Sequence, residues 1–308
     1  MTTAIETGQT PEVAAPQAGA TPLGRFVSDF CESRVAVGAL AMLLLIALIA
    51  IFAPWIAPQD PYDLRQLDVM NGRLPPMAQG MDGQTFWLGT DAQGRDMLSG
   101  IMYGLRTSLS VGIGASFTAL MIGMAAGLLA AYFGGFVDTL IMRIVDIQLS
   151  FPSILTALIL LAVLGQGIDK IILALIAVQW AYYARTVRGT ALVERRKEYI
   201  EAAQCLALSH RRVVFKHLLP NCLPPLIVVN TVLVASAIAL EATLSFLGLG
   251  LPITKPSLGL LIANGFAYML SGKYWISFFP GVALLITIVC INLVGDQLRD
   301  VLNPRLQK

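Results

Sequence analysis

Long uncharged stretches alternate with short charged segments along most of this chain. A membrane-spanning helix needs about 20 consecutive apolar residues, because the hydrocarbon core of a bilayer is about 30 Å thick. The uncharged stretch at residues 171–184 is the shortest. We expect its helix to continue beyond Ala184, with the side chains of Arg185 and Arg188 reaching one membrane interface. The pattern predicts an all-α, polytopic membrane protein with six spanning helices, over residues 35–57, 107–137, 147–168, 171–184, 217–240 and 274–295.

The N-terminal residues 1–34 have too little apolar surface to build a core, and we expect a tail that is partly disordered. A cleavable signal peptide would place a short apolar core near the start of the chain. The first apolar run instead begins at Val35 and is long enough to span, so we expect it to stay as a signal anchor. Residues 58–105 then form a predicted external loop.

Small residues in the second predicted helix indicate close helix packing. Gly123 and Gly127 lie four apart among many alanines, and such residues let helix backbones approach where lipid and neighbour are equally apolar. We therefore expect this helix inside the bundle. The segment 256–272 is apolar but short and interrupted by glycine. It is predicted as a helix at the outer face, or dipping partly into the membrane, and not as a seventh span.

Prolines predict where the helices are irregular. Pro152, Pro224 and Pro225 each remove a helical hydrogen bond, so we expect kinks or breaks at these positions. Pro280 is expected in the first turn of the sixth helix, where the missing N–H costs nothing.

The composition agrees with a membrane protein. The chain is 56% hydrophobic and 13% charged, against about 25% charged in soluble domains, and its mean hydropathy is +0.72. A net charge of +2 gives no indication of a nucleic-acid partner. The four cysteines have no paired spacing, so we expect buried small apolar residues and neither a disulfide framework nor a zinc site.

The placement of lysine and arginine predicts the orientation of the chain. Of the 21 such residues, 14 fall on the side of the N-terminus, and the opposite loop offsets its cations with six aspartates. Loops rich in Lys and Arg remain in the cytoplasm. Both termini, including residues 301–308, are therefore predicted to be cytoplasmic.

The chemistry of an enzyme or of an autonomous pump is missing from the sequence. It has no HExxH motif and no G-x-x-x-x-G-K-[ST] motif, so the chain has no P-loop with which to bind ATP. A secondary transporter would place ionisable groups near the bilayer midplane, whereas Asp146 and Glu241 lie near the ends of predicted spans. Glu241 is expected to be a hydrogen-bonded structural carboxylate, with a substrate ligand as the alternative.

Uncharged polar residues lie within the spans. We expect them to form hydrogen bonds between helices, and the alternative is that some line a translocation path. They are Gln148, Gln166, Gln179, Asn230 and Asn292. Such a path would hold a solute weakly, so the energy for transport must come from elsewhere.

The charged segment between the fourth and fifth helices predicts a short amphipathic helix. Tyr199, Ala202, Ala203 and Leu206 follow the spacing of one helical face. Ser209 can cap a second short helix that follows. Two interpretations stay open from the pattern alone: an interfacial helix resting on anionic lipid headgroups, or a surface on which another protein docks.

The sequence "EYIEAAQCLALSHRRVVFKHLLPN", residues 198–221, resembles the EAA loop of ABC importer permeases. Glu201, Ala202 and Ala203 match its opening, and Leu219 and Pro220 match its closing Leu-Pro. Residue Ala207 stands where that loop usually has glycine. Glycine tolerates a left-handed conformation that alanine resists, so we expect the turn to stay closer to helical geometry or to shift by one residue.

Four further stretches narrow the resemblance to one group. The chain after residue 25 is similar to the C-type permease subunits of dipeptide, oligopeptide and nickel importers. The stretches are "WLGTDAQGRDMLSGIMYGLRTSL" (87–109), "GGFVDTLIMRIVDIQLSFPSIL" (134–155), "EATLSFLGLGLPITKPSLGLLI" (241–262) and "GDQLRDVLNPR" (295–305).

That resemblance implies a type I ABC importer permease (MetI-like) fold in the bacterial inner membrane. It implies a permease core over residues 106–300, with five membrane helices and a cytoplasmic coupling loop at 189–217. Its partners would be a homologous B-type permease, two cytoplasmic ATPases that carry the ATP and Mg, and an external solute-binding protein. The chain itself would bind no cofactor and catalyse no reaction.

The resemblance also implies a function and a site. The chain would form half of a path for short peptides, with nickel, glutathione or another small solute as the alternative cargo. A stand-alone secondary transporter or channel is the alternative from another class. The residues that would couple to an ATPase are Tyr199, Glu201, Ala202, Ala203, Leu206, Ala207, Leu219 and Pro220.

A polar motif precedes the second predicted helix. Asp91, Gly94, Arg95 and Asp96 are expected to form a turn and a helix cap, with Asp91 as the cap and with Arg95 and Asp96 exposed. The alternative is a contact with the partner permease or with the binding protein.

Overall fold

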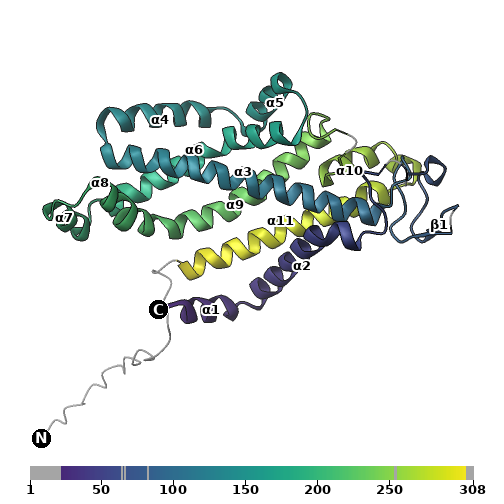
Figure 1. Cartoon of the computed structure of the whole chain (residues 1–308), viewed down its shortest axis with the longest axis horizontal. Coiled ribbons are helices and arrows are strands. Elements are labelled where there is room, and N and C mark those ends of the chain that lie inside the picture. Colours follow the sequence, from purple (N-terminus) through teal and green to yellow (C-terminus); the bar gives the residue numbers. More distant parts are fainter. Residues whose placement is uncertain (1–21, 64, 66, 82, 253–254, 303–308) are drawn as a thin grey trace, which may run out of the picture.

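The computed structural model describes residues 22–63, 65, 67–81, 83–252 and 255–302. The predicted tail upstream of Pro22 and most of the predicted C-terminal segment lie outside this part of the chain. The described residues form an elongated bundle of helices (Figure 1). Its long helices are α2 (Arg34–Ile56), α3 (Met97–Phe133), α4 (Gly135–Ser150), α5 (Ser153–Leu164), α6 (Ile168–Glu194), α9 (Leu219–Phe246) and α11 (Trp275–Leu302).

Shorter elements lie at the two ends of the bundle (Figure 1). One end carries α1 (Pro22–Glu32), α7 (Glu198–Cys205), α8 (His210–Arg212) and a π-helix, η2 (Val213–Leu218). The opposite end carries α10 (Leu258–Phe266), the 3₁₀ turns η1 (Val69–Asn71) and η3 (Met269–Ser271), and the antiparallel pair of β1 (Ala78–Gln79) and β2 (Thr85–Phe86). Because α10 has only 9 residues, the prediction that segment 256–272 makes no seventh span is confirmed.

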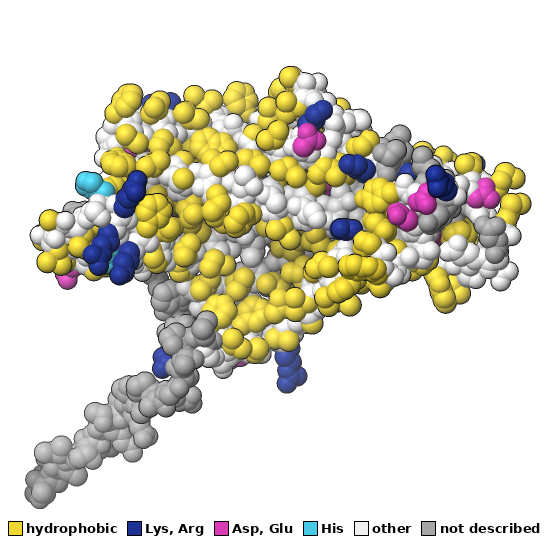
Figure 2. All heavy atoms as spheres, in the orientation of Figure 1, with side chains coloured by type: hydrophobic (Ala, Val, Ile, Leu, Met, Phe, Trp, Pro, Cys, Tyr) yellow, Lys and Arg dark blue, Asp and Glu magenta, His cyan; other side chains and the backbone are white. Residues whose placement is uncertain are grey.

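Both ends of the described chain lie at the end of the bundle that carries α7 (Figure 1). The α1 helix packs against the last turns of α11, where the Gln297 side-chain amide donates to the Asp29 carbonyl over 3.2 Å. Figure 2 shows apolar side chains over most of the surface between the two ends, with basic side chains gathered beside α7 and α8. This arrangement fits a bundle that crosses a membrane along its long axis.

Fewer described helices qualify as membrane spans than the six predicted. Within the described residues, α2, α3, the run from His210 to Phe246, and α11 are long and apolar enough, and α4 with α5 makes a fifth if the bent pair is one span. The α6 helix, which contains the fourth predicted span, does not qualify, and it carries Arg185 and Arg188. These arginines pair with Asp146 and Asp138 of α4.

The helix ends differ from the bounds predicted for the second and third spans. The α3 helix begins at Met97 and ends at Phe133, where the positive φ of Gly134 and Gly135, 65° and 54°, turns the chain into α4. The segment 138–146 was expected outside the spans because it contains the charged residues Asp138, Arg143 and Asp146, but it lies in α4. Its acids are neutralised across the interface with α6. A search for uncharged stretches therefore misses a helix whose charged residues form ion pairs with a neighbouring helix.

The prolines behave in three ways. At Pro152 the predicted break is confirmed, because α4 and α5 meet there at 91°. Pro224 and Pro225 lie inside α9, which continues through them, so the chain does not break there. The α11 helix begins at Trp275, which leaves Pro280 beyond its first turn, against the prediction.

Close packing between α3 and α6 confirms the role predicted for the paired glycines. A Cβ on Gly123 would lie 2.4 Å from the Trp180 carbonyl oxygen, and one on Gly127 would lie 2.5 Å from the Ala184 carbonyl oxygen. No side chain fits between these backbones. The α3 helix also contacts α2, α4, α9, α10 and α11, and therefore lies inside the bundle as expected.

Three of the uncharged polar side chains form the expected hydrogen bonds. Gln179 of α6 accepts from the Ser116 hydroxyl of α3 over 3.0 Å and donates to the Leu233 carbonyl of α9 over 2.9 Å. The Tyr183 hydroxyl donates to the Asn230 side chain over 2.8 Å. Likewise, the side-chain amide of Gln166 donates to the Gly248 carbonyl over 2.8 Å. Gln148 and Asn292 form no such bond with another described side chain.

Candidate functional site

The segment predicted to dock a protein forms α7, which is fastened to the end of α6. The Glu194 carboxylate accepts from Lys197 Nζ over 2.6 Å and from the Tyr199 hydroxyl over 2.7 Å. Partial burial, and then the hydrogen bond to Glu194, raise the pKa of Tyr199 to about 12. The tyrosine therefore stays neutral and keeps its proton for this bond. The start of α7 is thus held at a fixed angle to α6.

The two alanines of α7 face in different directions. Ala203 is only 4% exposed and packs with Ile200 against Val213 and Leu218 of the π-helix. Ala202 is exposed, because adjacent residues on a helix lie about 100° apart. Of the four residues predicted to share one face, Tyr199, Ala202 and Leu206 are exposed, and only Ala203 is turned into the protein.

Exposed residues of α7 are Glu198, Tyr199, Glu201, Ala202 and Cys205. We refer to the surface formed by Glu198, Glu201, Ala202 and Cys205 as the outer face of α7. Leu206 follows directly after the helix and is 74% exposed. This surface has one small residue in the middle, two carboxylates and an apolar side chain beside it. It can admit a close-packed partner that supplies positive charge at its rim.

The turn after α7 is left-handed at the position where related loops usually have glycine. Ala207 has a φ of 51°. The Leu208 N–H donates to the Ala203 carbonyl over 3.2 Å, and Leu208 packs with Ala203 on the same cluster. These are the bond and the contact of a Schellman motif. Neither the helical geometry nor the one-residue shift that we expected occurs, and the alanine adopts the strained conformation itself.

Replacing Ala207 with glycine is expected to stabilise the protein by about 1 kcal/mol, because glycine adopts this conformation without the clash of a Cβ. The control is Ala202→Gly, the same change within the helix, which should destabilise α7 by about 1 kcal/mol. Amide hydrogen exchange of residues 198–208 measures both effects. Equal effects of the two substitutions would show that the strain at Ala207 is unimportant.

The remaining predicted coupling residues lie where the π-helix joins α9. Leu219 is half-buried against the cluster around Ile200 and Ala203, and Pro220 is exposed in the first turn of α9. Proline has no N–H to donate, so a backbone bond is missing where the π-helix gives way to the α-helix. The structure thus brings both residues to the same end of the bundle as α7.

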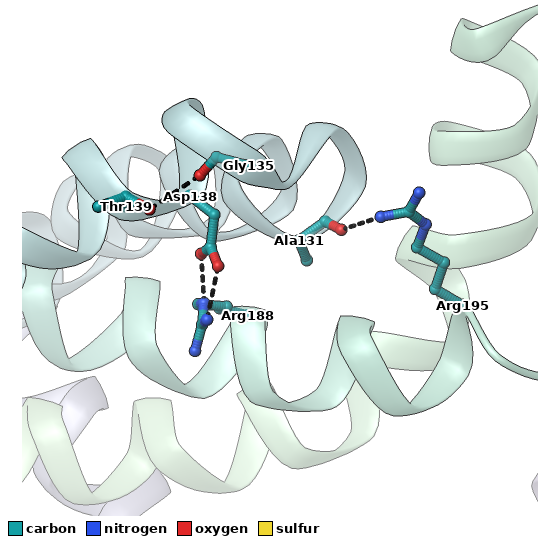
Figure 3. A network of polar contacts seen from close by, with 6 residues as sticks. All are labelled: Ala131, Gly135, Asp138, Thr139, Arg188 and Arg195. Atoms are coloured by element: carbon teal, nitrogen blue, oxygen red, sulfur yellow. Dashed lines mark hydrogen bonds and ion pairs between the residues drawn. The ribbon is translucent and has the colours of Figure 1, made fainter.

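Residues that the sequence motifs did not indicate connect this segment to the bundle (Figure 3). Arg188 of α6 binds both carboxylate oxygens of Asp138 on α4, with Nη2 2.6 Å from Oδ2. Arg195, directly after α6, donates to the Ala131 carbonyl of α3 over 2.9 Å and lies over the ring of Tyr132. The end of α6 that carries α7 is therefore fixed to the ends of α3 and α4.

In the predicted external loop, the residue that caps α3 and the burial of the charged residues both differ from the prediction. Asp91, Arg95 and Asp96 are all buried, so the expected exposure of Arg95 and Asp96 is wrong. Asp96 is the cap of α3, since its side chain accepts from the Ser99 N–H over 2.8 Å. Asp91 accepts from the N–H groups of Gln93 and Arg95 over 2.7 and 3.0 Å, and its burial raises its pKa.

Gly94 completes this loop. Its φ is 79°, and a Cβ there would lie 2.0 Å from the Asp68 carbonyl oxygen. The four residues Asp91, Gly94, Arg95 and Asp96 thus hold the loop and the start of α3 together. A contact with another subunit stays a prediction for them, and it would use the surface that they support.

Glu241 is fully buried in α9. It accepts from the hydroxyls of Ser108 and Ser245 over 2.9 and 2.8 Å. The structure thus agrees with the expected structural carboxylate.

Two of the four cysteines are not buried, against the prediction. Cys222 and Cys290 are buried, whereas Cys31 and Cys205 are exposed. The exposed thiol of Cys205 therefore lies on the outer face of α7, where a thiol reagent can reach it.

A wide groove runs along α9 between α6 and α11. Its volume is about 910 Å³, within the range of about 300–1,000 Å³ that small-molecule sites occupy. Its lining is mostly apolar and includes Leu149, Pro224 and Val232, with Arg185, Arg299 and Asp296 as the charged side chains. A groove of this shape can accommodate a neighbouring helix or line half of a pathway.

Two family models match the chain. That of binding-protein-dependent transport system inner membrane components covers residues 119–308, and that of the N-terminal transmembrane domain of oligopeptide transport permease C covers residues 21–76. The solved structure of the MetNI methionine ABC transporter in an inward-facing conformation is similar in fold. The TM-score is 0.55 at 22% identity, over 67% of this chain and 98% of that one.

Curated relatives match over most of their length. A di/tripeptide transport system permease protein of Pseudomonas aeruginosa is 37% identical, over 93% of both chains. A probable D,D-dipeptide transport system permease protein of Escherichia coli is 39% identical, over 89% of this chain and 88% of its own length. A glutathione transport system permease protein of Pectobacterium atrosepticum is 35% identical, over 93% and 92% respectively.

Proposed function

This chain belongs to the binding-protein-dependent transport system inner membrane components, the permease subunits of ABC importers, and we propose that it carries short peptides across the bacterial inner membrane. It forms one half of the pathway, and a homologous B-type permease forms the other. The relatives named for di- and tripeptides support this choice of solute. The groove along α9 is the part of this chain that faces the pathway.

The observation that carries the proposal is the exposed outer face of α7 on a helix that is firmly attached to the bundle. The sequence has no P-loop, so the energy for transport has to enter from another subunit. Two cytoplasmic ATPases supply it, with ATP and Mg bound to them and not to this chain. The end of the bundle that carries α7 and both described termini then lies in the cytoplasm, and the end with β1 and β2 faces the external binding protein.

The coupling follows from the contacts of α7. When the ATPases close, they displace the outer face of α7, and the buried side chains of Ile200 and Ala203 carry that movement to the π-helix. The π-helix is continuous with α9, which lines the groove. At the same time Arg195 and Arg188 pass the displacement to the ends of α3 and α4. Packed helices move as rigid bodies, so the groove opens or closes as a unit.

Glutathione is the second candidate solute, because one relative is named for glutathione transport at 35% identity. Glutathione is itself a short peptide, so the same groove suits both. Competition by unlabelled glutathione against a labelled dipeptide distinguishes the two.

Reconstitution tests this function. Proteoliposomes with this chain, its partner permease, both ATPases and the binding protein should accumulate a labelled dipeptide only when ATP is present. The chain alone should transport none. Solute movement by the chain alone along an ion gradient would contradict the assignment.

A further inference from the structure

A second groove lies between the last turns of α3 and the segment formed by α8 and the π-helix. Its volume is about 360 Å³, and its lining is apolar apart from His210 and Arg211. Leu128, Leu129 and Phe133 form the α3 wall, and Phe215 and Leu219 are among the residues of the other wall. Leu129, Phe133 and Phe215 are exposed. An apolar groove of this size on a membrane protein favours a hydrocarbon chain.

The walls of this groove are fixed in place. The Tyr132 hydroxyl of α3 and Nδ1 of His210 share a hydrogen bond of 2.5 Å, and their rings meet edge to face at 5.6 Å. The ring of Tyr132 also lies under the guanidinium of Arg195. The groove is thus preformed, and a ligand can enter it without first ordering its walls.

Positive charge without a neutralising partner borders the groove. Arg211 lines the groove, and Arg212 and Lys216 are exposed on the same short segment, next to Arg211 and next to the lining residue Phe215 respectively. None of these three forms an ion pair with any residue that the structure describes. From Ala202 to Leu240 the sequence contains no aspartate or glutamate. The rim therefore favours an anionic group.

We propose that this groove binds an anionic phospholipid, with one acyl chain along the apolar walls and the headgroup phosphate at Arg211. The groove lies at the end of the bundle where basic side chains meet the apolar surface (Figure 2). In a spanning bundle this is the depth of the lipid headgroups. A free anion would use only the charged rim, and a helix of another protein would use only the apolar walls. A phospholipid uses both.

The bound lipid joins α3 to the π-helix, which is continuous with α9. Occupancy should therefore stabilise the junction across which α7 acts. This inference does not depend on the transported solute, and it can hold whether or not α7 docks on an ATPase.

Native mass spectrometry of the full chain in a mild detergent tests the proposal. The chain is titrated with phosphatidylglycerol and with phosphatidylcholine of the same acyl chains. We expect tighter binding of phosphatidylglycerol. Arg211→Ala should weaken that binding about fivefold, the equivalent of about 1 kcal/mol per basic residue near an anionic surface. It should weaken phosphatidylcholine binding less, because the choline cation offsets the phosphate charge.

A second variant tests the apolar part. Ala125 lines the groove and is exposed, so Ala125→Trp fills it without entering the core. This variant should weaken the binding of both lipids. The matched controls are Arg196→Ala and Ala41→Trp, exposed residues elsewhere on the chain, which should bind both lipids as the native chain does.

Equal affinity of the native chain for the two lipids would overturn the proposal. So would an Arg211→Ala variant with unchanged phosphatidylglycerol binding. If Ala125→Trp kept its lipid but lost the partner permease during co-purification, the groove would be a protein interface, and the proposal would likewise fail.

Discussion

Ala202→Trp is expected to reduce ATP-dependent uptake about thirtyfold or more. Ala202 is the small residue in the middle of the outer face of α7, and an indole there keeps a partner from close contact. The centre of a protein interface contributes about 2 kcal/mol or more through single residues, which corresponds to this factor. Peptide uptake into proteoliposomes and co-purification of the ATPases measure the effect.

Two controls separate docking from folding. Ala41→Trp, on the exposed side of α2, should leave uptake unchanged. Ala203→Trp should instead lower the stability of the chain itself, because Ala203 is buried against the π-helix. Normal uptake by Ala202→Trp in stable protein would refute the docking role of this face.

Gly123→Ala is expected to destabilise the chain by about 2 kcal/mol. The added methyl group would lie 2.4 Å from the Trp180 carbonyl oxygen and 2.5 Å from Tyr183 Cβ, so α3 and α6 have to separate. These two helices make the most extensive contact in the bundle. Thermal unfolding in detergent, followed by tryptophan fluorescence, measures the loss.

The same helix supplies the matched control. Gly114 has no neighbour within 4 Å of the position of an added Cβ. Gly114→Ala should therefore raise stability by about 0.5 kcal/mol through helix propensity alone. If the two variants unfolded at the same temperature, close packing at Gly123 would not be the cause.

The sequence indicated the class of fold and the small residues that pack it, because both depend on local patterns. It did not indicate α4, because the charges of Asp138 and Asp146 resemble those of a loop. Their partners, Arg188 and Arg185, lie in α6. The sequence nevertheless contained a signal for these pairs. In two antiparallel helices the first acid, Asp138, pairs with the second arginine, Arg188, and the second acid with the first arginine.

The candidate site was predicted in its position but not in its geometry. Periodicity places Tyr199, Ala202, Ala203 and Leu206 on one face, but it does not show which side of a short helix packs against the bundle. In the structure, Ile200 and Ala203 pack against the bundle. The external motif failed for a similar reason, because the position of a cap depends on where α3 begins. That position is Asp96 and not Asp91.

The left-handed conformation of Ala207 shows where tertiary structure overrides residue preference. The Schellman bond from Leu208 to Ala203 and the burial of both side chains hold the turn. Together they offset about 1 kcal/mol of backbone strain. A change from glycine to alanine at this position therefore need not alter the path of the loop.

The central claim is that the outer face of α7 contacts an ATPase, and the native thiol of Cys205 tests it directly. Cys31 is the other exposed thiol in the described part of the chain, so Cys31→Ser leaves Cys205 as the reactive site. A short cross-linker that carries a thiol-reactive group and a photoreactive group is attached to Cys205 of the separate chain, which is then assembled with its partners and illuminated. Mass spectrometry of the linked peptides should identify an ATPase subunit. Links only to the partner permease, or only to lipid, would contradict the account.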